Sequence, residues 1–228
     1  MTKTQSSTKV TSLEVYGRTD SGGKERSEDT VLINADIGLF LVADGVGGNP
    51  AGDVASRMAA DTTAAAMTRL EEAFKLTRPA PGEGLRRRVE EAVQSAVDKA
   101  SERVFEKGNS RPELKTMATS MLLFKQAGAS AVIGHVGNSR AYLIRRNRIY
   151  RLTDDHTLAW HLVSKGALKK EEVAAFPYKN VITRAVGKYP TVSVDTLPLD
   201  LSPGDIYLLC SNGVTGVVDE DELFEIAI

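Results

Sequence analysis

One short stretch of the chain combines an acidic side chain with several glycines at the end of an apolar run. The apolar residues 39–43 lead into Asp44, and Gly45-Val46-Gly47-Gly48 follows. A buried strand positions the residue at its end rigidly, and glycines let an ion, a water molecule or a phosphate approach the backbone closely. This carboxylate is therefore suited to hold a metal ion. The same stretch is also typical of a strand-turn-helix junction in which Asp44 only accepts backbone hydrogen bonds.

A helix is expected directly after the glycine-rich turn. Asn49 is suited to cap this helix and Pro50 to occupy its first position, a pairing that starts helices well. Apolar residues recur at helical spacing over residues 51–74 and again over residues 85–104, and the Pro/Gly-rich residues 78–82 separate the two segments. Two long successive helices are expected to pack as an antiparallel pair.

Most of the remaining apolar segments are short and predict strands. Arg146-Asn147 is expected to form a hairpin turn between two of them, and the acidic run 219–222 starts a last helix. Strands joined by hairpins and alternating with paired helices favour an α+β domain built on antiparallel sheets. The predicted strands are residues 14–18, 30–33, 38–43, 120–124, 131–136, 141–144, 149–152, 192–196 and 206–210, with shorter helices at 158–165 and 170–175.

The composition is that of one globular domain. The chain has 228 residues, 42% of them hydrophobic and 26% charged, which is enough to bury a substantial core. We divide it into a disordered tail, residues 1–12, and a domain, residues 13–228. The net charge of -1 gives no electrostatic reason to expect nucleic acid as a partner. No run of about 18 apolar residues exists that could span a membrane.

The chain has a single cysteine, Cys210, so an internal disulfide is impossible. A reducing compartment is the default for such a chain, and we expect a cytoplasmic monomer. Cys210 follows the apolar residues 206–209 and is expected to be a small core residue rather than a nucleophile.

Seven local patterns occur along the chain in one order. The patterns are Arg26-Ser27-Glu28-Asp29, Ala43-Asp44-Gly45-Val46-Gly47-Gly48, Gly52-Asp53-Val54-Ala55-Ser56, Val136-Gly137-Asn138-Ser139-Arg140-Ala141-Tyr142, Leu152-Thr153-Asp154-Asp155-His156-Thr157-Leu158, Thr183-Arg184-Ala185-Val186-Gly187, and Pro203-Gly204-Asp205 through Cys210-Ser211-Asn212-Gly213. Together they resemble the metal-dependent serine/threonine phosphatases of type 2C, in particular their bacterial branch. The likeness runs from about Glu14 to Ile228.

The resemblance implies a fold and an activity. The fold is a four-layer αββα sandwich in which two antiparallel sheets are flanked by helix pairs, with two Mg²⁺ or Mn²⁺ ions in the cleft at one end. The activity is hydrolysis of phosphoserine and phosphothreonine in proteins phosphorylated by serine/threonine kinases. Divalent ions serve this chemistry because they lower the pKa of bound water from 15.7 to roughly 7, so that hydroxide is available at neutral pH.

Individual roles follow from the same resemblance. Asp44 matches the catalytic carboxylate that bridges both metal ions, and the carbonyl of Gly45 matches a backbone ligand. Glu28 and Asp29 match the acidic pair that holds metal-bound waters. Hard cations prefer oxygen ligands, which all four positions offer. For Glu28 and Asp29 the alternative interpretation is solvated charge at the start of a strand.

Two asparagines and the end of the chain depart from the family pattern. The family has Asp at the position of Asn212, where it ligates a core metal, and Asp at the position of Asn138, where it helps to bind a third metal. An amide oxygen can coordinate but lacks the negative charge, so we expect weaker binding of divalent ions and regard the third ion as doubtful. The family also continues past the equivalent of Ile228 to an Asp-Asn pair on a final strand, so we expect that strand and its ligand to be missing. These departures leave open an alternative function, a pseudo-phosphatase that binds a phosphoprotein or a regulatory partner without turnover.

Two residues compete for the role of holding the substrate phosphate. The family's phosphate-binding arginine sits four residues before the glutamate that matches Glu28. This chain has Lys24 at that position, and Arg26 lies two residues closer to Glu28. In a loop two residues shorter, Arg26 takes this catalytic role and binds phosphate with its two-pronged guanidinium group. Otherwise Lys24 offers a point charge. We favour Arg26.

The histidines are assigned no catalytic role. His135 lies within an apolar strand and is expected to be a core residue with its hydrogen bonds satisfied. His156 and His161 flank a helix start, where capping or packing is expected. Residues 165–180 correspond to a flap that varies among relatives, and we expect it to gate substrate entry.

Overall fold

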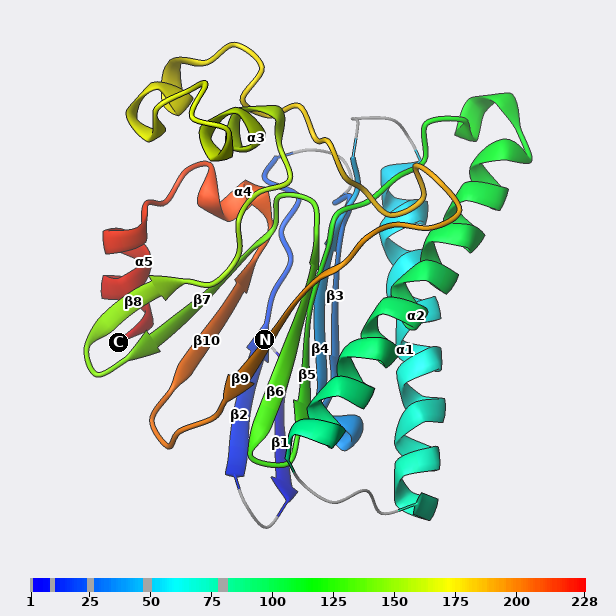
Figure 1. Cartoon of the computed structure of the whole chain (residues 1–228), viewed down its shortest axis with the longest axis vertical. Helices are drawn as coiled ribbons and strands as arrows, with labels where there is room; N and C mark the ends of the chain where they lie inside the picture. Colours follow the sequence, from blue (N-terminus) through cyan, green and yellow to red (C-terminus); the bar gives the residue numbers. More distant parts are fainter. Residues whose placement is uncertain (1, 9–10, 24–26, 47–50, 78–81) are drawn as a thin grey trace.

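A computed structural model describes residues 2–8, 11–23, 27–46, 51–77 and 82–228 of the chain (Figure 1). Two antiparallel sheets form its centre, a pair of long helices covers one of them, and short helical segments lie at the upper end of the molecule in Figure 1. The α+β class with two antiparallel sheets, expected from the sequence, is confirmed.

The larger sheet has five strands in the order β3-β4-β5-β6-β9, and every neighbouring pair is antiparallel. In the register of the first pair, Asp29 lies opposite Asp44. Two acidic residues therefore meet at one end of this sheet. The strands are β3 (Asp29–Asn34), β4 (Leu39–Asp44), β5 (Met121–Ala127), β6 (Ser130–Val136) and β9 (Asp195–Asp200).

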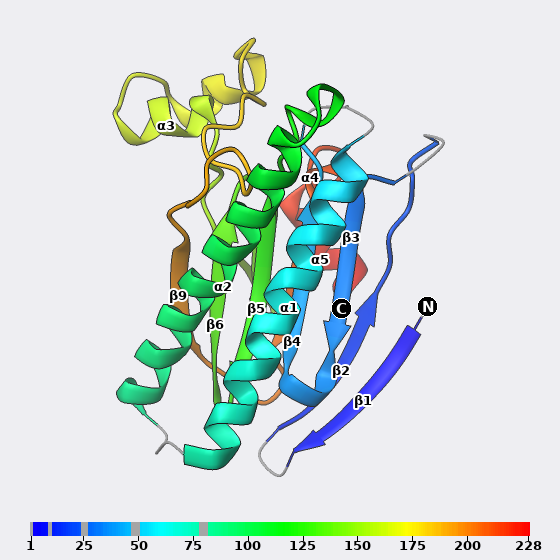
Figure 2. The same cartoon turned by 90° about the vertical axis from the view of Figure 1, so that its right-hand side faces the viewer.

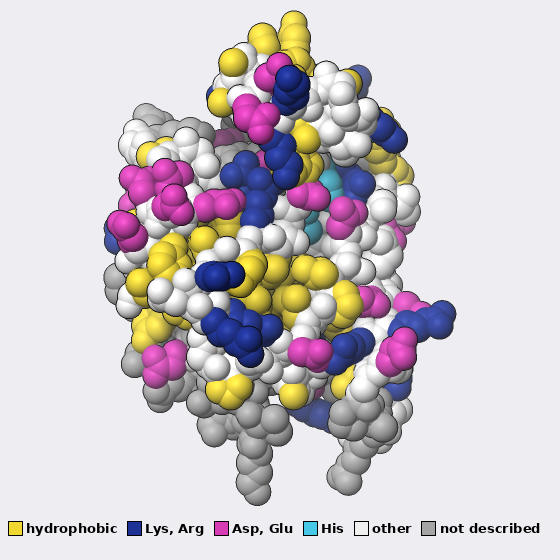
Figure 3. All heavy atoms as spheres, turned by 60° about the vertical axis from the view of Figure 1, so that its left-hand side comes forward, with side chains coloured by type: hydrophobic (Ala, Val, Ile, Leu, Met, Phe, Trp, Pro, Cys, Tyr) yellow, Lys and Arg dark blue, Asp and Glu magenta, His cyan; other side chains and the backbone are white. Residues whose placement is uncertain are grey.

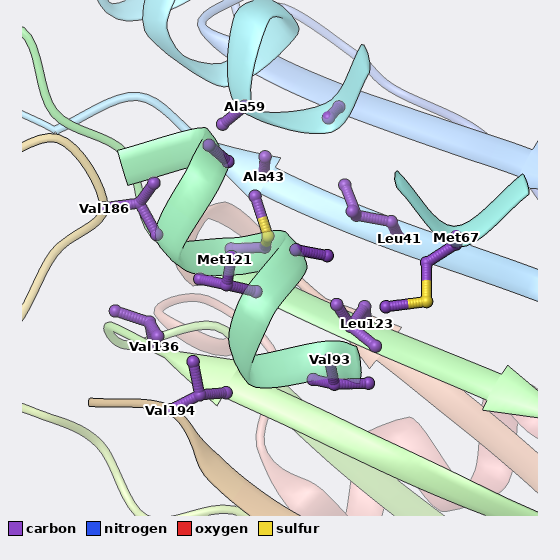
Figure 4. Close-up of a cluster of buried hydrophobic side chains, with 14 of the residues drawn as sticks. Leu41, Ala43, Ala59, Met67, Val93, Met121, Leu123, Val136, Val186 and Val194 are labelled. Carbon is purple, nitrogen blue, oxygen red and sulfur yellow. The ribbon is translucent and has the colours of Figure 1, made fainter. Parts of the chain in front are cut away.

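Two helices, α1 (Gly52–Thr77) and α2 (Glu83–Asn109), lie side by side across one face of this sheet (Figure 2). They form the antiparallel pair that the sequence predicts. Their apolar faces bury the main core of the molecule against the strands, and burial of aliphatic side chains is the principal stabilising contribution in such a layer. Figure 4 shows this core, to which Leu41, Met67, Val93, Met121 and Leu123 contribute.

The smaller sheet has the order β10-β7-β8 and is also antiparallel. The expected hairpin turn at Arg146 and Asn147 is confirmed, since their φ angles are 51° and 60°, as a tight turn of this kind requires. The strands are β7 (Arg140–Arg145), β8 (Arg148–Arg151) and β10 (Ile206–Cys210).

A second apolar cluster joins the two sheets. Because side chains alternate along a strand, Leu122 and Phe124 of β5 face away from the helices and pack with Ala141 of β7. Phe40 of β4 packs against the same cluster. Asp44 lies four residues further along that strand, so it projects to the same side, toward the second sheet.

The first residues of the chain do not match the expectation of a tail over residues 1–12. The structure has a strand, β1 (Thr2–Thr8), which pairs antiparallel with β2 (Thr11–Gly17). The physical reason is strand pairing, because each of the seven residues of β1 lies opposite a residue of β2 and the pairing holds the backbone extended.

The strand expected at residues 192–196 begins later, because β9 starts at Asp195. The backbone N–H groups of Val192 and Val194 donate instead to Asp98 and Gln94 on α2, over 3.1 and 3.0 Å. The apolar pair is therefore tied to a helix rather than to a neighbouring strand.

Short helical segments complete the fold. α5 packs against β8 and begins at a capping box formed by Asp219 and Glu222. In the described part of the chain it is the helix that covers the smaller sheet. No described helix combines the length and the apolar character needed to cross a membrane. The segments are the 3₁₀ turns Ala35–Ile37, Pro112–Leu114 and Lys170–Ala175, with α3 (Leu158–Ser164), α4 (Asn212–Thr215) and α5 (Glu220–Ala227).

Candidate active site

A buried carboxylate at the end of β4 is the centre of the site. Asp44 is 9% exposed, and its Oδ2 atom has no hydrogen-bond partner among the described residues. Burial raises the pKa of Asp44 to about 7, and the negative charges of Asp29 and Glu28 add to this rise. The backbone N–H of Asn212 opposes the rise because it donates a hydrogen bond to the carboxylate. An acid in this environment gains strongly from a nearby positive charge.

The other two acidic residues lie beside Asp44. Asp29 faces it across the β3-β4 pair and accepts a hydrogen bond of 2.7 Å from the Ser211 hydroxyl group. Glu28 precedes β3, and its carbonyl accepts a hydrogen bond of 3.2 Å from the N–H of Gly45. The three acidic residues predicted to take part in the site are therefore neighbours in the structure.

Glycine is required at two positions where the chain turns from β4 into α1. A Cβ atom on Gly45 would lie 2.5 Å from the backbone of Gly52, and one on Gly52 would lie 2.7 Å from Oε1 of Glu28. Side chains at these positions would push the strand end, the helix start and Glu28 apart. The predicted cap at Asn49 and Pro50 lies outside the described residues.

The backbone of Asp44 is held by a polar pair at the start of β5. The carbonyl of Asp44 accepts hydrogen bonds of 2.8 Å from the N–H of Ser120 and 2.9 Å from the Thr119 hydroxyl group. Both residues are completely buried. Sequence reasoning missed this pair, although two polar residues directly before an apolar strand were a signal that could have pointed to it.

Asn138 lies in the turn that connects β6 to β7. It is buried, and its Oδ1 atom has no hydrogen-bond partner within the part of the chain that the structure describes. Gly137 has a φ of 108°, and a Cβ atom there would lie 2.4 Å from that of Ser120, so only glycine fits. The Ser139 hydroxyl group pairs with that of Ser120 at 2.8 Å. The same residue, Ser120, therefore anchors both Asp44 and the Asn138 turn.

His156 holds the other side of this turn. Its Nδ1 atom accepts a hydrogen bond of 3.0 Å from the N–H of Gly137, and the backbone N–H of His156 donates to the Gly137 carbonyl over 2.7 Å. Nε2 lies 3.0 Å from a carboxylate oxygen of Asp195. Burial lowers the pKa of His156. The expectation of a packing role is confirmed for this residue, while the cap of α3 is Thr157.

The expectation for His135 is only half right. The residue is buried in β6, but Nε2 has no hydrogen-bond partner among the described residues, so its hydrogen bonds are not satisfied. Its ring lies 4.6 Å from that of His156, between centroids. Burial lowers the pKa of His135 to about 3, which leaves it neutral.

Cys210 is half-buried and burial raises the pKa of its thiol to about 11, which does not suit a nucleophile.

A pocket of about 960 Å³ opens at this end of the molecule. Its walls bring together four of the predicted metal ligands, Asp44, Gly45, Asn138 and Asn212, from β4, the β6-β7 turn and the start of α4. Glu28 and Asp29 are not among the residues that line the pocket. Lys24 and Arg26, the predicted phosphate-binding residues, lie outside the described residues.

The side chains at this end fit a hard divalent cation. Asp44 and Asn138 each present a buried oxygen with no hydrogen-bond partner among the described residues, and every predicted ligand binds through oxygen. Within the described ranges, however, no three His, Cys, Asp or Glu side chains gather closely enough to hold a metal ion. Among the described residues, carbonyl and amide oxygens would complete such a site, as the predicted ligands Gly45, Asn138 and Asn212 offer.

Comparison with known proteins assigns this fold and site to a class. Residues 17–226 match the family model described as protein phosphatase 2C. The chain belongs to the protein phosphatase 2C family, as the order of its motifs predicts. Members of this family are metal-dependent.

Bacterial serine/threonine phosphatases are among the similar proteins. The serine/threonine phosphatase stp of Listeria monocytogenes serotype 4b (strain F2365) is 34% identical over 207 residues, which cover 91% of this chain and 76% of that protein. The crystal structure of Mycobacterium tuberculosis PstP/Ppp is similar with a TM-score of 0.73 at 29% identity, over 89% of this chain and 79% of that one. A structure of the PstP catalytic domain in complex with 2 manganese ions has a TM-score of 0.70 at 29% identity, over 89% and 78%.

Proposed function

We propose that this serine/threonine protein phosphatase of the 2C type hydrolyses phosphoserine and phosphothreonine in proteins with the help of two divalent ions, Mg²⁺ or Mn²⁺. The observation that supports this most directly is the pair of buried oxygens, Asp44 Oδ2 and Asn138 Oδ1, that have no hydrogen-bond partner in the described residues and belong to residues lining one pocket. The manganese complex of the related PstP catalytic domain supports the choice of metal.

The residues that would hold the ions supply oxygen ligands of different charge. Asp44 gives the carboxylate, Gly45 a carbonyl, and Asn138 and Asn212 neutral amides, while Glu28 and Asp29 stand behind them as acceptors for ordered water. A divalent ion bound there would lower the pKa of a water ligand toward neutrality, which makes hydroxide available for attack on phosphorus. The protein itself holds the geometry, because hydrogen bonds from the Thr119 hydroxyl group and the Ser120 N–H to the Asp44 carbonyl fix the strand end before substrate arrives.

Binding of the substrate phosphate is assigned to Arg26 within the same proposal, with Lys24 as the alternative. A guanidinium group can donate two parallel hydrogen bonds to phosphate, whereas an ammonium group supplies only a point charge. No observation favours the second function considered from the sequence, a pseudo-phosphatase without turnover.

Replacement of Asp44 by Asn tests the proposed function. In millimolar Mn²⁺ the natural protein should hydrolyse p-nitrophenyl phosphate and a phosphothreonine peptide, and Asp44→Asn should lower kcat by a factor of about 10³ or more, the scale on which electrostatic groups at reacting centres contribute. A circular dichroism spectrum must show that the variant is folded. A folded natural protein without activity at any Mn²⁺ concentration would contradict the proposal.

A further inference from the structure

The pocket that contains Asp44 extends under the segment that follows β8. We extend the flap predicted at residues 165–180 to residues 158–182 and call this whole segment the flap from here on. It lies at the upper end of the molecule in Figure 1 and contributes Trp160, Lys170 and Lys179 to the pocket wall. The Lys170 Nζ atom lies 5.4 Å from the centroid of the Trp160 ring, and the guanidinium carbon of Arg151 lies 5.0 Å from it. One aromatic side chain is thus surrounded by cations beside the candidate active site.

The arginines of this wall are partly neutralised within the protein. Arg140 donates two hydrogen bonds to Asp155, over 2.9 and 2.7 Å, and Arg151 donates to the same carboxylate over 2.6 Å. Two cations therefore share one anion, and one positive charge remains in excess. These three residues form a fixed part of the wall.

The two flap lysines that line the pocket, Lys170 and Lys179, are not neutralised. In the described part of the chain neither Lys170 nor Lys179 has a carboxylate oxygen within 4.0 Å, the limit for an ion pair. The Lys179 ammonium group donates to the carbonyl of Ala174 over 2.8 Å. The nearby Glu172 is occupied differently, because it accepts a hydrogen bond from the backbone N–H of Lys169. Both lysine side chains therefore face the pocket with their charge available to a ligand.

The pocket is also larger than a phosphorylated side chain requires. About 960 Å³ lies at the upper end of the range for small-molecule sites. Its lining has carboxylates at Asp44 and Asp155 but four cationic side chains, at Arg140, Arg151, Lys170 and Lys179. Figure 3 shows Lys and Arg side chains gathered below the uppermost segment of the molecule, with acidic side chains to either side.

We propose that Trp160, Lys170 and Lys179 form a specificity surface that binds acidic side chains flanking the phosphorylated residue of a substrate protein. This inference rests on the proposed phosphatase function and names its substrate class, phosphoproteins with Asp or Glu near the phosphorylated residue. Trp160 packs against the peptide, and the lysine pair attracts its carboxylates. Complementary charge of this kind gives a binding surface selectivity and speeds the encounter.

The chain offers a direct probe of this surface, because Trp160 is its only tryptophan. Its fluorescence can follow the titration of the protein with two phosphothreonine peptides, one with Asp and Glu around the phosphorylated residue and one with Asn and Gln in their place. Excess EDTA prevents turnover, so binding is measured without catalysis. The acidic peptide should bind about tenfold more tightly, as expected for two partly exposed ion pairs acting together, and the difference should shrink in high salt.

Matched variants assign the preference to the flap lysines. In the double variant Lys170→Gln, Lys179→Gln the ratio of the two dissociation constants should fall to about two or less, the level at which little ion pairing remains. Lys169→Gln removes the same charge from an exposed neighbour that does not line the pocket, and it should keep the natural ratio. In Mn²⁺, the ratio of kcat/KM for the two peptides should follow the same pattern.

The outcomes separate this inference from the proposed function. Equal binding of the two peptides by the natural protein, or a preference that survives in the double variant, would overturn the specificity surface even if p-nitrophenyl phosphate is hydrolysed. Absence of hydrolysis in Mn²⁺ would contradict the phosphatase function, and the titration in EDTA would still decide whether the flap binds acidic peptides.

Discussion

At the scale of single residues, the site depends on the charge of the side chains around Asp44. Three acidic residues lie together there, and one neighbour, Asn212, is an amide that donates its backbone N–H to the Asp44 carboxylate. Because the side chain of Asn212 is a neutral amide, it avoids the repulsion that a fourth carboxylate at this position would add. It also weakens the attraction for a cation, because ligand charge is one of the factors that set the affinity of oxygen sites.

Replacement of Asn212 by Asp should therefore strengthen metal binding. We expect the affinity for Mn²⁺, measured by isothermal titration calorimetry, to rise about tenfold, since one full negative charge is added to an oxygen site. In metal-free buffer the same variant should unfold at a lower temperature because the acidic residues repel one another. Asn109→Asp, at the exposed end of α2 and away from the pocket, is the control for the metal affinity, which it should leave unchanged. Unchanged Mn²⁺ affinity in Asn212→Asp would argue against a ligand at this position.

A second residue, His135, makes stability depend on pH. Its pKa is about 3 in the folded protein, against a usual value of 6.5. Below pH 6.5 the unfolded chain binds more protons at this site, so the contribution of His135 to the free energy of unfolding falls as the pH drops from 6.5 toward 3. Between pH 6.5 and 4.5 the loss is about 2 kcal/mol.

The variant His135→Leu tests this pH dependence. Leucine fills the apolar site without titrating, so the loss of stability over the same pH interval should shrink by about that amount in urea unfolding experiments. His156, whose pKa is also lowered, adds to the fall in stability, whereas Asp44, whose pKa is raised to about 7, opposes it, so the difference between the variant and the natural protein isolates His135. A variant whose stability still falls as steeply as that of the natural protein would show that His135 is not the group responsible.

At the scale of elements, the β6-β7 turn positions a candidate ligand through backbone shape. Gly137 has a left-handed φ and contacts Ser120 so closely that no side chain fits, and Asn138 follows it directly. The turn is held from both sides, by the paired hydroxyl groups of Ser120 and Ser139 and by the hydrogen bonds of His156. Displacement of the turn would move Asn138 away from Asp44.

Replacement of Gly137 by Ala should lower the free energy of unfolding more than the same change in a turn that has room for a side chain. We expect about 3 kcal/mol or more of lost stability, because left-handed strain and a clash with Ser120 act together. Gly128→Ala is the matched control, since Gly128 has a φ of 66° with no atom within 4 Å of the added carbon, and strain alone should cost about 1 kcal/mol. Urea unfolding of both variants measures the difference in their free energies of unfolding. Equal losses of stability would mean that Ser120 moves aside without cost when a side chain is added at position 137.

The elements also show what the sequence can and cannot predict. Long periodic segments such as α1 and α2 were predicted well, because their apolar spacing determines which face is buried. The strand expected at residues 192–196 was misplaced since Val192 and Val194 are bound by side chains of α2, which lie about 100 positions away in the chain. Asp44 was identified from the sequence because glycines follow it directly at the end of an apolar run. Thr119 and Ser120 were missed because their role consists of long-range hydrogen bonds that no local pattern records.

At the scale of the whole molecule, the candidate ligands come from both sheets. Asp44 ends a strand of the five-stranded sheet, Asn212 follows β10 of the three-stranded sheet, and Asn138 lies in the turn that crosses from one to the other. A cation held by all three would tie the sheets together. It would bind the folded chain and not the unfolded one, and such binding raises stability by mass action.

Mn²⁺ should therefore raise the melting temperature of the protein. At a concentration 100-fold above the dissociation constant the gain is about 2.7 kcal/mol, which corresponds to a shift of roughly 5 °C or more in calorimetry. The shift should disappear in Asp44→Asn. An unchanged melting temperature in saturating Mn²⁺, with the natural residue at position 44, would contradict a site shared between the sheets.

The crossing from β6 to β7 has a consequence for how the protein matures. Neither half of the sandwich contains enough of the pocket to act alone, so catalytic competence can arise only after the two layers have docked in their final alignment. Enzyme activity during refolding should consequently lag behind the recovery of secondary structure. For this chain, the time at which turnover begins would report when the two sheets dock during refolding.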